Sequence, residues 1–111
     1  MSNVTRTPPK NITIPSAFLN ASSSGATQII AAQPGMSIRV IDAAVISTLA
    51  NTVKFQSNAT DISAAFPLGA NGGLVLPFNE HGWFQTAVGE ALNVNLSVGT
   101  ATGISINYII L

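Results

Sequence analysis

The stretch from Leu74 to Val98, LVLPFNEHGWFQTAVGEALNVNLSV, contains the clearest strand pattern of the chain and its only Trp. In Leu92–Val98 the apolar side chains occupy every second position, with Asn, Asn and Ser between them. This period predicts a half-buried strand with one face toward the core and one uncharged, hydrated face. Gly82–Val88 is rich in aromatic and β-branched residues, and Gly89-Glu90 offers a turn. The stretch therefore predicts a hairpin entered through the loop Pro77–Gly82.

Short β-prone runs separated by Gly, Pro and Asn turns recur through the rest of the chain. In Ile104–Leu111 both faces become apolar after Asn107, which predicts a strand that is central in its sheet or pressed against another subunit. The small residues of Ser16–Gly25 predict a loop. Further strands are expected at Ile12–Ile14, Gln28–Ala32 and Val53–Gln56, and Asp61–Phe66 is expected to be a short edge strand or a loop.

The longest β-prone segment, Met36–Leu49, changes its inward phase once. Its apolar side chains fall first at Met36, Ile38 and Val40, and then at Ile41, Ala43 and Val45. A strand that keeps one face buried can shift by one residue only through a bulge or a corner, so we expect one near Val40. A helix over Ile41–Ala50 is the competing interpretation, which the β-branched residues in it disfavour.

About eight short strands without a convincing long helix predict an all-β domain, a two-sheet antiparallel sandwich. A jelly-roll-like topology is the first expectation and an immunoglobulin-like sandwich the second. Residues 12–111 form this single domain, and residues 1–11 form an extended basic N-terminal arm with two consecutive prolines.

The surface of this domain is expected to be unusually poor in charge. Charged residues are 7% of the sequence, against about 25% in an average protein, and the formal net charge is zero. A freely diffusing protein normally keeps a charged surface, so this composition favours a surface partly covered by neighbouring subunits. The alternative is a protein that its hydroxyl and amide side chains keep soluble alone.

The residues needed for most chemistry are missing or isolated. The chain has no Cys and one histidine, His81, which excludes a disulfide framework and a multi-histidine metal site. No G-x-S-x-G motif accompanies that histidine, and Glu80 and Glu90 lie too far apart along the predicted strand for paired carboxylates. Four cations balanced by four acids make no basic patch for nucleic acid, and no apolar run is long enough to span a membrane. We expect no enzyme activity, no cofactor and no metal.

Three segments, Asn71–Pro77, Gly82–Ala87 and Gly89–Ser97, resemble small virion structural proteins of tailed bacteriophages. The resemblance implies a β-sandwich or jelly-roll domain that assembles as a trimer and decorates a capsid or builds part of a tail. The expected function is that of a capsid decoration, or cement, protein: a homotrimer that binds the major capsid protein and stabilises the head. It would be made in the host cytoplasm and lie on the outer surface of the virion.

Two groups of residues are candidates for the interface with partners. Arg6 and Lys10 give the N-terminal arm two positive charges, whereas the remainder carries two cations against four acids. Adjacent strand residues face opposite ways, so one ring of Trp83-Phe84 should face the core and the other solvent or a partner. The apolar end Ile109-Ile110-Leu111 completes the predicted seam. The alternative functions are a tail or baseplate component, and a carbohydrate-binding module or adhesin that binds glycans through Trp83, Phe84 and Tyr108.

Overall fold

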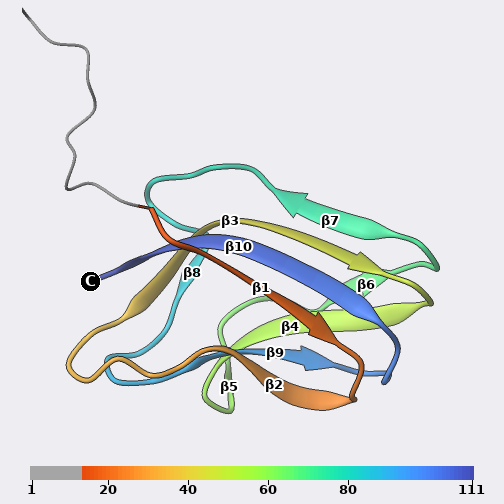
Figure 1. The fold of residues 1–111 in the computed structure, drawn as a ribbon, viewed down its shortest axis with the longest axis horizontal. Helices are drawn as coiled ribbons and strands as arrows, with labels where there is room; N and C mark the ends of the chain where they lie inside the picture. Colours follow the sequence, from red (N-terminus) through yellow and green to blue (C-terminus); the bar gives the residue numbers. More distant parts are fainter. Residues whose placement is uncertain (1–13) are drawn as a thin grey trace, which may run out of the picture.

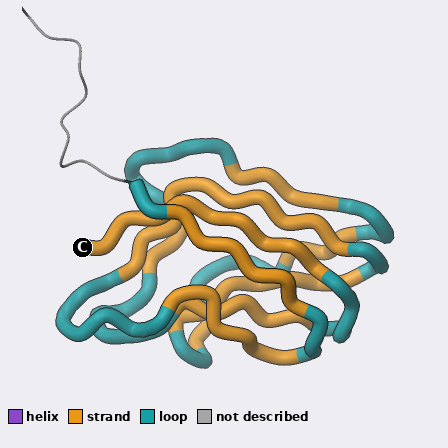
Figure 2. The backbone as a smooth tube through the Cα atoms, in the orientation of Figure 1, coloured by secondary structure: helices purple, strands orange, loops and turns teal. Residues whose placement is uncertain are grey.

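A computed structural model describes residues 14–111, which fold into a sandwich of two antiparallel five-stranded sheets (Figures 1 and 2). The predicted all-β sandwich is confirmed. The predicted arm at residues 1–11 lies outside the described residues, as do the first two residues of the expected strand Ile12–Ile14. The ten strands are β1 (Ser16–Ala21), β2 (Gly25–Ile30), β3 (Ile38–Ser47), β4 (Asn51–Ser57), β5 (Thr60–Asp61), β6 (Phe66–Leu68), β7 (Gly73–Leu76), β8 (Phe84–Gln85), β9 (Leu92–Leu96) and β10 (Thr102–Ile110).

The strand order is that of a jelly roll. The first sheet, here sheet A, has the order β1-β10-β3-β7, and β8 pairs with the far end of β3. The second, sheet B, has the order β2-β9-β4-β5, and β6 also pairs with β4. Without the two-residue strands β5 and β8, eight strands remain as β1-β10-β3-β7 facing β2-β9-β4-β6, the double Greek key of a jelly roll.

The predicted phase shift in β3 is a β-bulge. Ile38 and Val40 are buried, and then Ile41, Ala43 and Val45 are buried. Asn107 of β10 lies opposite Asp42 and Tyr108 lies opposite Val40, so Ile41 has no partner in β10. The strand stays within sheet A, and the helical alternative for Ile41–Ala50 is wrong because β3 occupies residues 41–47 and residues 48–50 form a non-helical connection to β4.

The core lies between the two sheets and is built from the inward side chains of both. Phe55 of β4 is fully buried, and its ring stacks on Phe84 of β8 with the ring centroids 4.7 Å apart. In β9 the alternation predicted for Leu92–Val98 is confirmed over Leu92–Leu96, where Leu92, Val94 and Leu96 are buried, but the strand ends there and Val98 is exposed. β10 lies between β1 and β3 as far as Asn107, but its end Tyr108–Ile110, where both faces are apolar, pairs in the ladder with β3 alone.

The predicted hairpin between Gly82–Val88 and Leu92–Val98 is wrong. Only Phe84–Gln85 is a strand, and it pairs with β3 in sheet A, whereas β9 lies between β2 and β4 in sheet B. The turn after it, closed by the amide of Glu90 and the carbonyl of Ala87, leads the chain from one sheet to the other. Local β propensity does not specify a partner strand; the stacking of Phe84 on Phe55 favours this crossing.

The predicted loop Ser16–Gly25 is also wrong, because its first six residues form β1 and pair with β10. Ala17 and Leu19 pack against the core, and Ala21 is buried in it. Small side chains suffice here because the neighbouring strand supplies the bulk of the packing. The segment Asp61–Phe66, expected as a short edge strand or a loop, is a loop over residues 62–65, and its two end residues belong to the short strands β5 and β6.

Candidate functional site

The outer face of sheet A is hollow at its centre. The registers place Phe18 opposite Ser105, Ser105 opposite Ala44, and Ala44 opposite Val75, so these side chains form one row across four strands. The row ends in two large exposed side chains, since Phe18 is 77% and Val75 73% exposed. The small Ser105 and Ala44 between them leave a groove of about 410 Å³.

A polar pair lies in the next row. Ser16 is opposite Asn107, which is opposite Asp42, and the Asn107 amide donates a 2.9 Å hydrogen bond to Asp42 Oδ2. Among the described residues, Asp42 is the only titratable one that lines the groove, so this part of the lining carries one negative charge and no cation. The groove is closed on the β7 side by Phe78, which is 61% exposed. The lining comprises Ser16, Ala17, Phe18, Asp42, Ala43, Ala44, Val75, Leu76, Pro77, Phe78, Ser105, Ile106 and Asn107.

The bulge in β3 places Asp42 on this surface. Ile38 and Val40 point inward, and strict alternation would bring Asp42 into the core with them. The extra residue, Ile41, shifts the alternation by one position, so Asp42 lies on the outer face and Ala43 packs in the core. The irregularity that the sequence pattern indicated therefore determines the polar end of the groove.

The two aromatic residues predicted for an interface lie on opposite sides of the backbone. Phe84 packs against the core, whereas Trp83 is 43% exposed. The indole nitrogen of Trp83 donates a 2.7 Å hydrogen bond to the carbonyl of Pro77. Trp83 thus holds the loop that presents Phe78 beside the groove, and Trp83 is not itself a lining residue.

The predicted C-terminal seam is divided between core and surface. Ile110 packs against the core, Ile109 is half-buried, and Leu111 is exposed. Leu111 exchanges two backbone hydrogen bonds with Ser37, of 2.9 and 3.0 Å, and the amide of Gly89 donates to the carbonyl of Met36. These bonds bring three exposed apolar residues to one end of the sandwich, here called the terminal patch: Met36, Val88 and Leu111. Arg6 and Lys10 lie outside the described residues.

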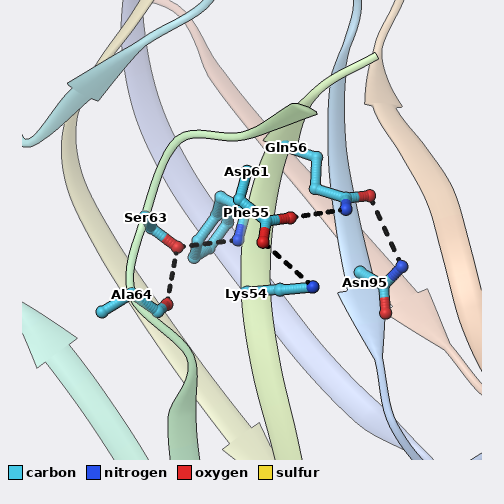
Figure 3. Close-up of polar contacts among 7 residues, drawn as sticks. All are labelled: Lys54, Phe55, Gln56, Asp61, Ser63, Ala64 and Asn95. Atoms are coloured by element: carbon cyan, nitrogen blue, oxygen red, sulfur yellow. Dashed lines mark hydrogen bonds and ion pairs between the residues drawn. The ribbon is translucent and has the colours of Figure 1, made fainter. Parts of the chain in front are cut away.

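The outer face of sheet B carries a continuous polar network instead (Figure 3). Gln56 donates a 2.8 Å hydrogen bond to Asp61 and accepts one from Asn95, and Lys54 forms a 3.1 Å ion pair with Asp61. The hydrogen bond from Gln56, and then that from Lys54, hold the pKa of Asp61 below its ordinary value of 3.8. Separately from this network, Ser63 accepts a hydrogen bond from the amide of Phe55 and donates one to the carbonyl of Ala64.

Within residues 14–111, no group of three or more His, Asp and Glu side chains is placed to hold a metal ion. This part of the chain also has no helix long and apolar enough to cross a bilayer.

The sequence interpretation missed the groove residues Phe18, Asp42, Phe78 and Asn107. Phe18 was missed because Ser16–Gly25 was predicted to be a loop, although the apolar residues Ala17, Leu19 and Ala21 alternate in this segment as in a strand. Asp42 follows from the phase shift once Ile41 is taken as the bulged residue. The meeting of Asp42 and Asn107 has no local signal, because it depends on the register of two strands 65 residues apart in sequence.

Comparison with known proteins identifies no family for this chain. No family model matches, and no curated protein matches in sequence. Among solved structures, the C-terminal domain of EclA, described as a sugar-binding protein, matches with a TM-score of 0.42 and 16% sequence identity. The match covers 96% of this chain and 84% of that one. A similarity this distant carries no inference about function.

Proposed function

We propose that the protein is a structural subunit of a tailed-bacteriophage virion, a capsid decoration protein that binds and stabilises the head as a homotrimer. The observation that carries the proposal is the terminal patch. Val88 is 68%, Leu111 45% and Met36 37% exposed, although all three are apolar. Exposed apolar side chains gathered at one end are typical of a surface that a partner covers.

The scarcity of charge supports the same function. Charged residues make up 7% of the sequence, so little electrostatic repulsion opposes the association of identical subunits. In the proposed trimer the terminal patch of each subunit packs against its neighbours, with Trp83 and Ile109 at the margin of the seam. Each subunit also binds the major capsid protein, and because it binds only the assembled head, binding raises the free energy of disassembly.

Light scattering over a dilution series tests the assembly. The expected result is a particle of three times the 11.4 kDa chain mass that persists at low micromolar concentration. Val88→Ser should shift the equilibrium toward monomer by weakening the seam. Leu49→Ser is the matched control, because Leu49 is similarly exposed but lies beyond the opposite end of β3. A wild-type protein that stays monomeric at millimolar concentration contradicts the trimer.

Mass spectrometry of purified virions tests the location. The protein should be present in the particle, and heads that lack it should release DNA at lower temperature. Presence in isolated tails instead of heads would support the alternative, a tail or baseplate component. Absence from both would overturn the virion assignment altogether.

A further inference from the structure

The groove on the outer face of sheet A has the composition of a small-ligand site. Its volume of about 410 Å³ falls within the range of about 300–1,000 Å³ that is usual for such sites. Most of the lining is apolar, and a few polar groups converge at one end. None of its lining residues belongs to the terminal patch, so a ligand here and a trimer there can coexist.

The lining excludes several ligand classes. An anionic ligand would meet the Asp42 carboxylate without a cation to balance it among the lining residues that the structure describes. A second copy of this face would bring two Asp42 carboxylates together, again without a cation among the lining residues. The groove therefore favours a ligand that carries no negative charge.

The polar end both accepts and donates hydrogen bonds. The Asp42 carboxylate accepts, the Asn107 amide has a donor and an acceptor group, and the Ser16 hydroxyl can do either, as can that of Ser105 on the floor of the groove. The bond from Asn107 to Asp42 fixes the orientation of both side chains. A polyol, whose hydroxyls donate and accept in turn, matches this arrangement. A simple cation would use the carboxylate alone.

The apolar walls of the groove can contact the apolar part of the same ligand. The rings of Phe18 and Phe78 and the methyls of Val75 are exposed around a floor of Ala44 and Ser105. A pyranose ring has an apolar C–H face and a rim of hydroxyls, so it can pack on an aromatic ring while its rim reaches the polar pair.

We propose that this groove binds a neutral hexopyranose, with its C–H face against Phe18 or Phe78 and its hydroxyls bonded to Asp42 and Asn107. The site goes beyond the assembly function and does not depend on it. Because one sugar ring makes few contacts, we expect a dissociation constant on the order of 1 mM.

The test is titration of the isotope-labelled full chain with the methyl glycosides of glucose, galactose and mannose, followed by amide chemical shifts. At least one glycoside should shift the amides of Asp42, Ala44 and Ser105 in a saturable way. Asp42→Asn, which keeps the shape of the side chain, should weaken binding about tenfold because it removes a charge-assisted acceptor. Phe18→Ala and Phe78→Ala separate the two walls, and at least one should weaken binding to a similar degree.

Ile46→Ala is the matched control, since Ile46 is exposed on the same face but does not line the groove. This variant should bind the glycoside with the same affinity as the wild type. Val88→Ser should also bind the glycoside normally, which separates failure of this site from failure of the trimer. Three outcomes overturn the proposal: no saturable shift up to 10-fold above the expected dissociation constant, binding that Asp42→Asn leaves unchanged, or tighter binding of tetramethylammonium than of any glycoside.

Discussion

The outer faces of the two sheets arise from the same alternating pattern but differ in what their side chains do. On sheet B, the outward residues Lys54, Gln56 and Asn95 bond to one another and to Asp61 at the sheet edge (Figure 3). On sheet A, the outward row is Phe18, Ser105, Ala44 and Val75, in which two small side chains lie between two large ones, and only the next row holds a hydrogen-bonded pair, Asn107 and Asp42. The face of sheet B is filled by polar side chains that mostly bond to one another, although the buried Oδ1 of Asn93 has no partner among the described residues, whereas the face of sheet A is hollow.

This difference indicates that the outer face of sheet B stabilises the fold, whereas the outer face of sheet A is available to bind a ligand. Polar groups that satisfy one another on sheet B have little left to offer a ligand, and they fasten the edge strand β5 to β4. The apolar side chains on sheet A contribute little to folding because they remain exposed. They are available for binding instead. The two faces should therefore respond to substitution in opposite ways.

Loss of the core stack should have the largest effect, because both faces depend on it. Phe55 from sheet B is fully buried and stacks on Phe84 of sheet A. Phe55→Ala should lower the free energy of unfolding by about 3–5 kcal/mol through the cavity that it leaves. Urea denaturation followed by Trp83 fluorescence measures this. A loss below about 1 kcal/mol would show that the two sheets do not share one core.

The next largest loss of stability should be found on the outer face of sheet B and not on that of sheet A. Gln56 is buried and bonds to both Asp61 and Asn95, so Gln56→Ala should cost about 1–2 kcal/mol of unfolding free energy. Ser105→Ala on the opposite face should change it by less than about 0.5 kcal/mol. Denaturation of the two variants in parallel gives the comparison. Equal losses would mean that the polar network on sheet B is not a stabilising feature.

The sequence predicted the strands more reliably than their partners. Strict alternation in Leu92–Leu96 and the phase shift at Ile41 are local signals of burial, and both appear in the structure as expected. The partner of Phe84–Gln85 was wrong because pairing in a jelly roll joins segments that are far apart in sequence. β1 was missed because its alternation is carried by alanines, whose small size resembles a loop composition.

The candidate groove was less predictable than the fold for a related reason. A hollow requires small residues beside large ones on adjacent strands, and Ser105 and Ala44 become neighbours only through the β3–β10 register. That Trp83 and Phe84 face opposite ways, in contrast, followed from their adjacency in the sequence, although which of the two faces the core did not. Local direction can be read from a sequence, whereas a row across four strands cannot.

Acid should weaken the polar face by a smaller amount than Gln56→Ala. The pKa of Asp61 is lower in the folded protein than its ordinary value of 3.8, owing to Gln56 and Lys54. Its contribution to stability is therefore present above that value and is lost as the pH falls through the folded pKa. Thermal midpoints between pH 6 and pH 2 should fall less for Asp61→Asn than for the wild type. Identical pH profiles would show that the ion pair with Lys54 is screened by solvent.

The smallest effect is expected at the most exposed residue of the hollow face. Phe18 is 77% exposed, so Phe18→Ser should change the free energy of unfolding by less than about 0.5 kcal/mol. Its neighbour Leu19 packs against the core, and Leu19→Ala should cost on the order of 1–2 kcal/mol in the same strand. Urea denaturation of both variants compares their free energies of unfolding, and so shows which of the two side chains of β1 stabilises the fold. A large loss at Phe18 would mean that its ring stabilises the fold, and the contrast between the two faces would then fail.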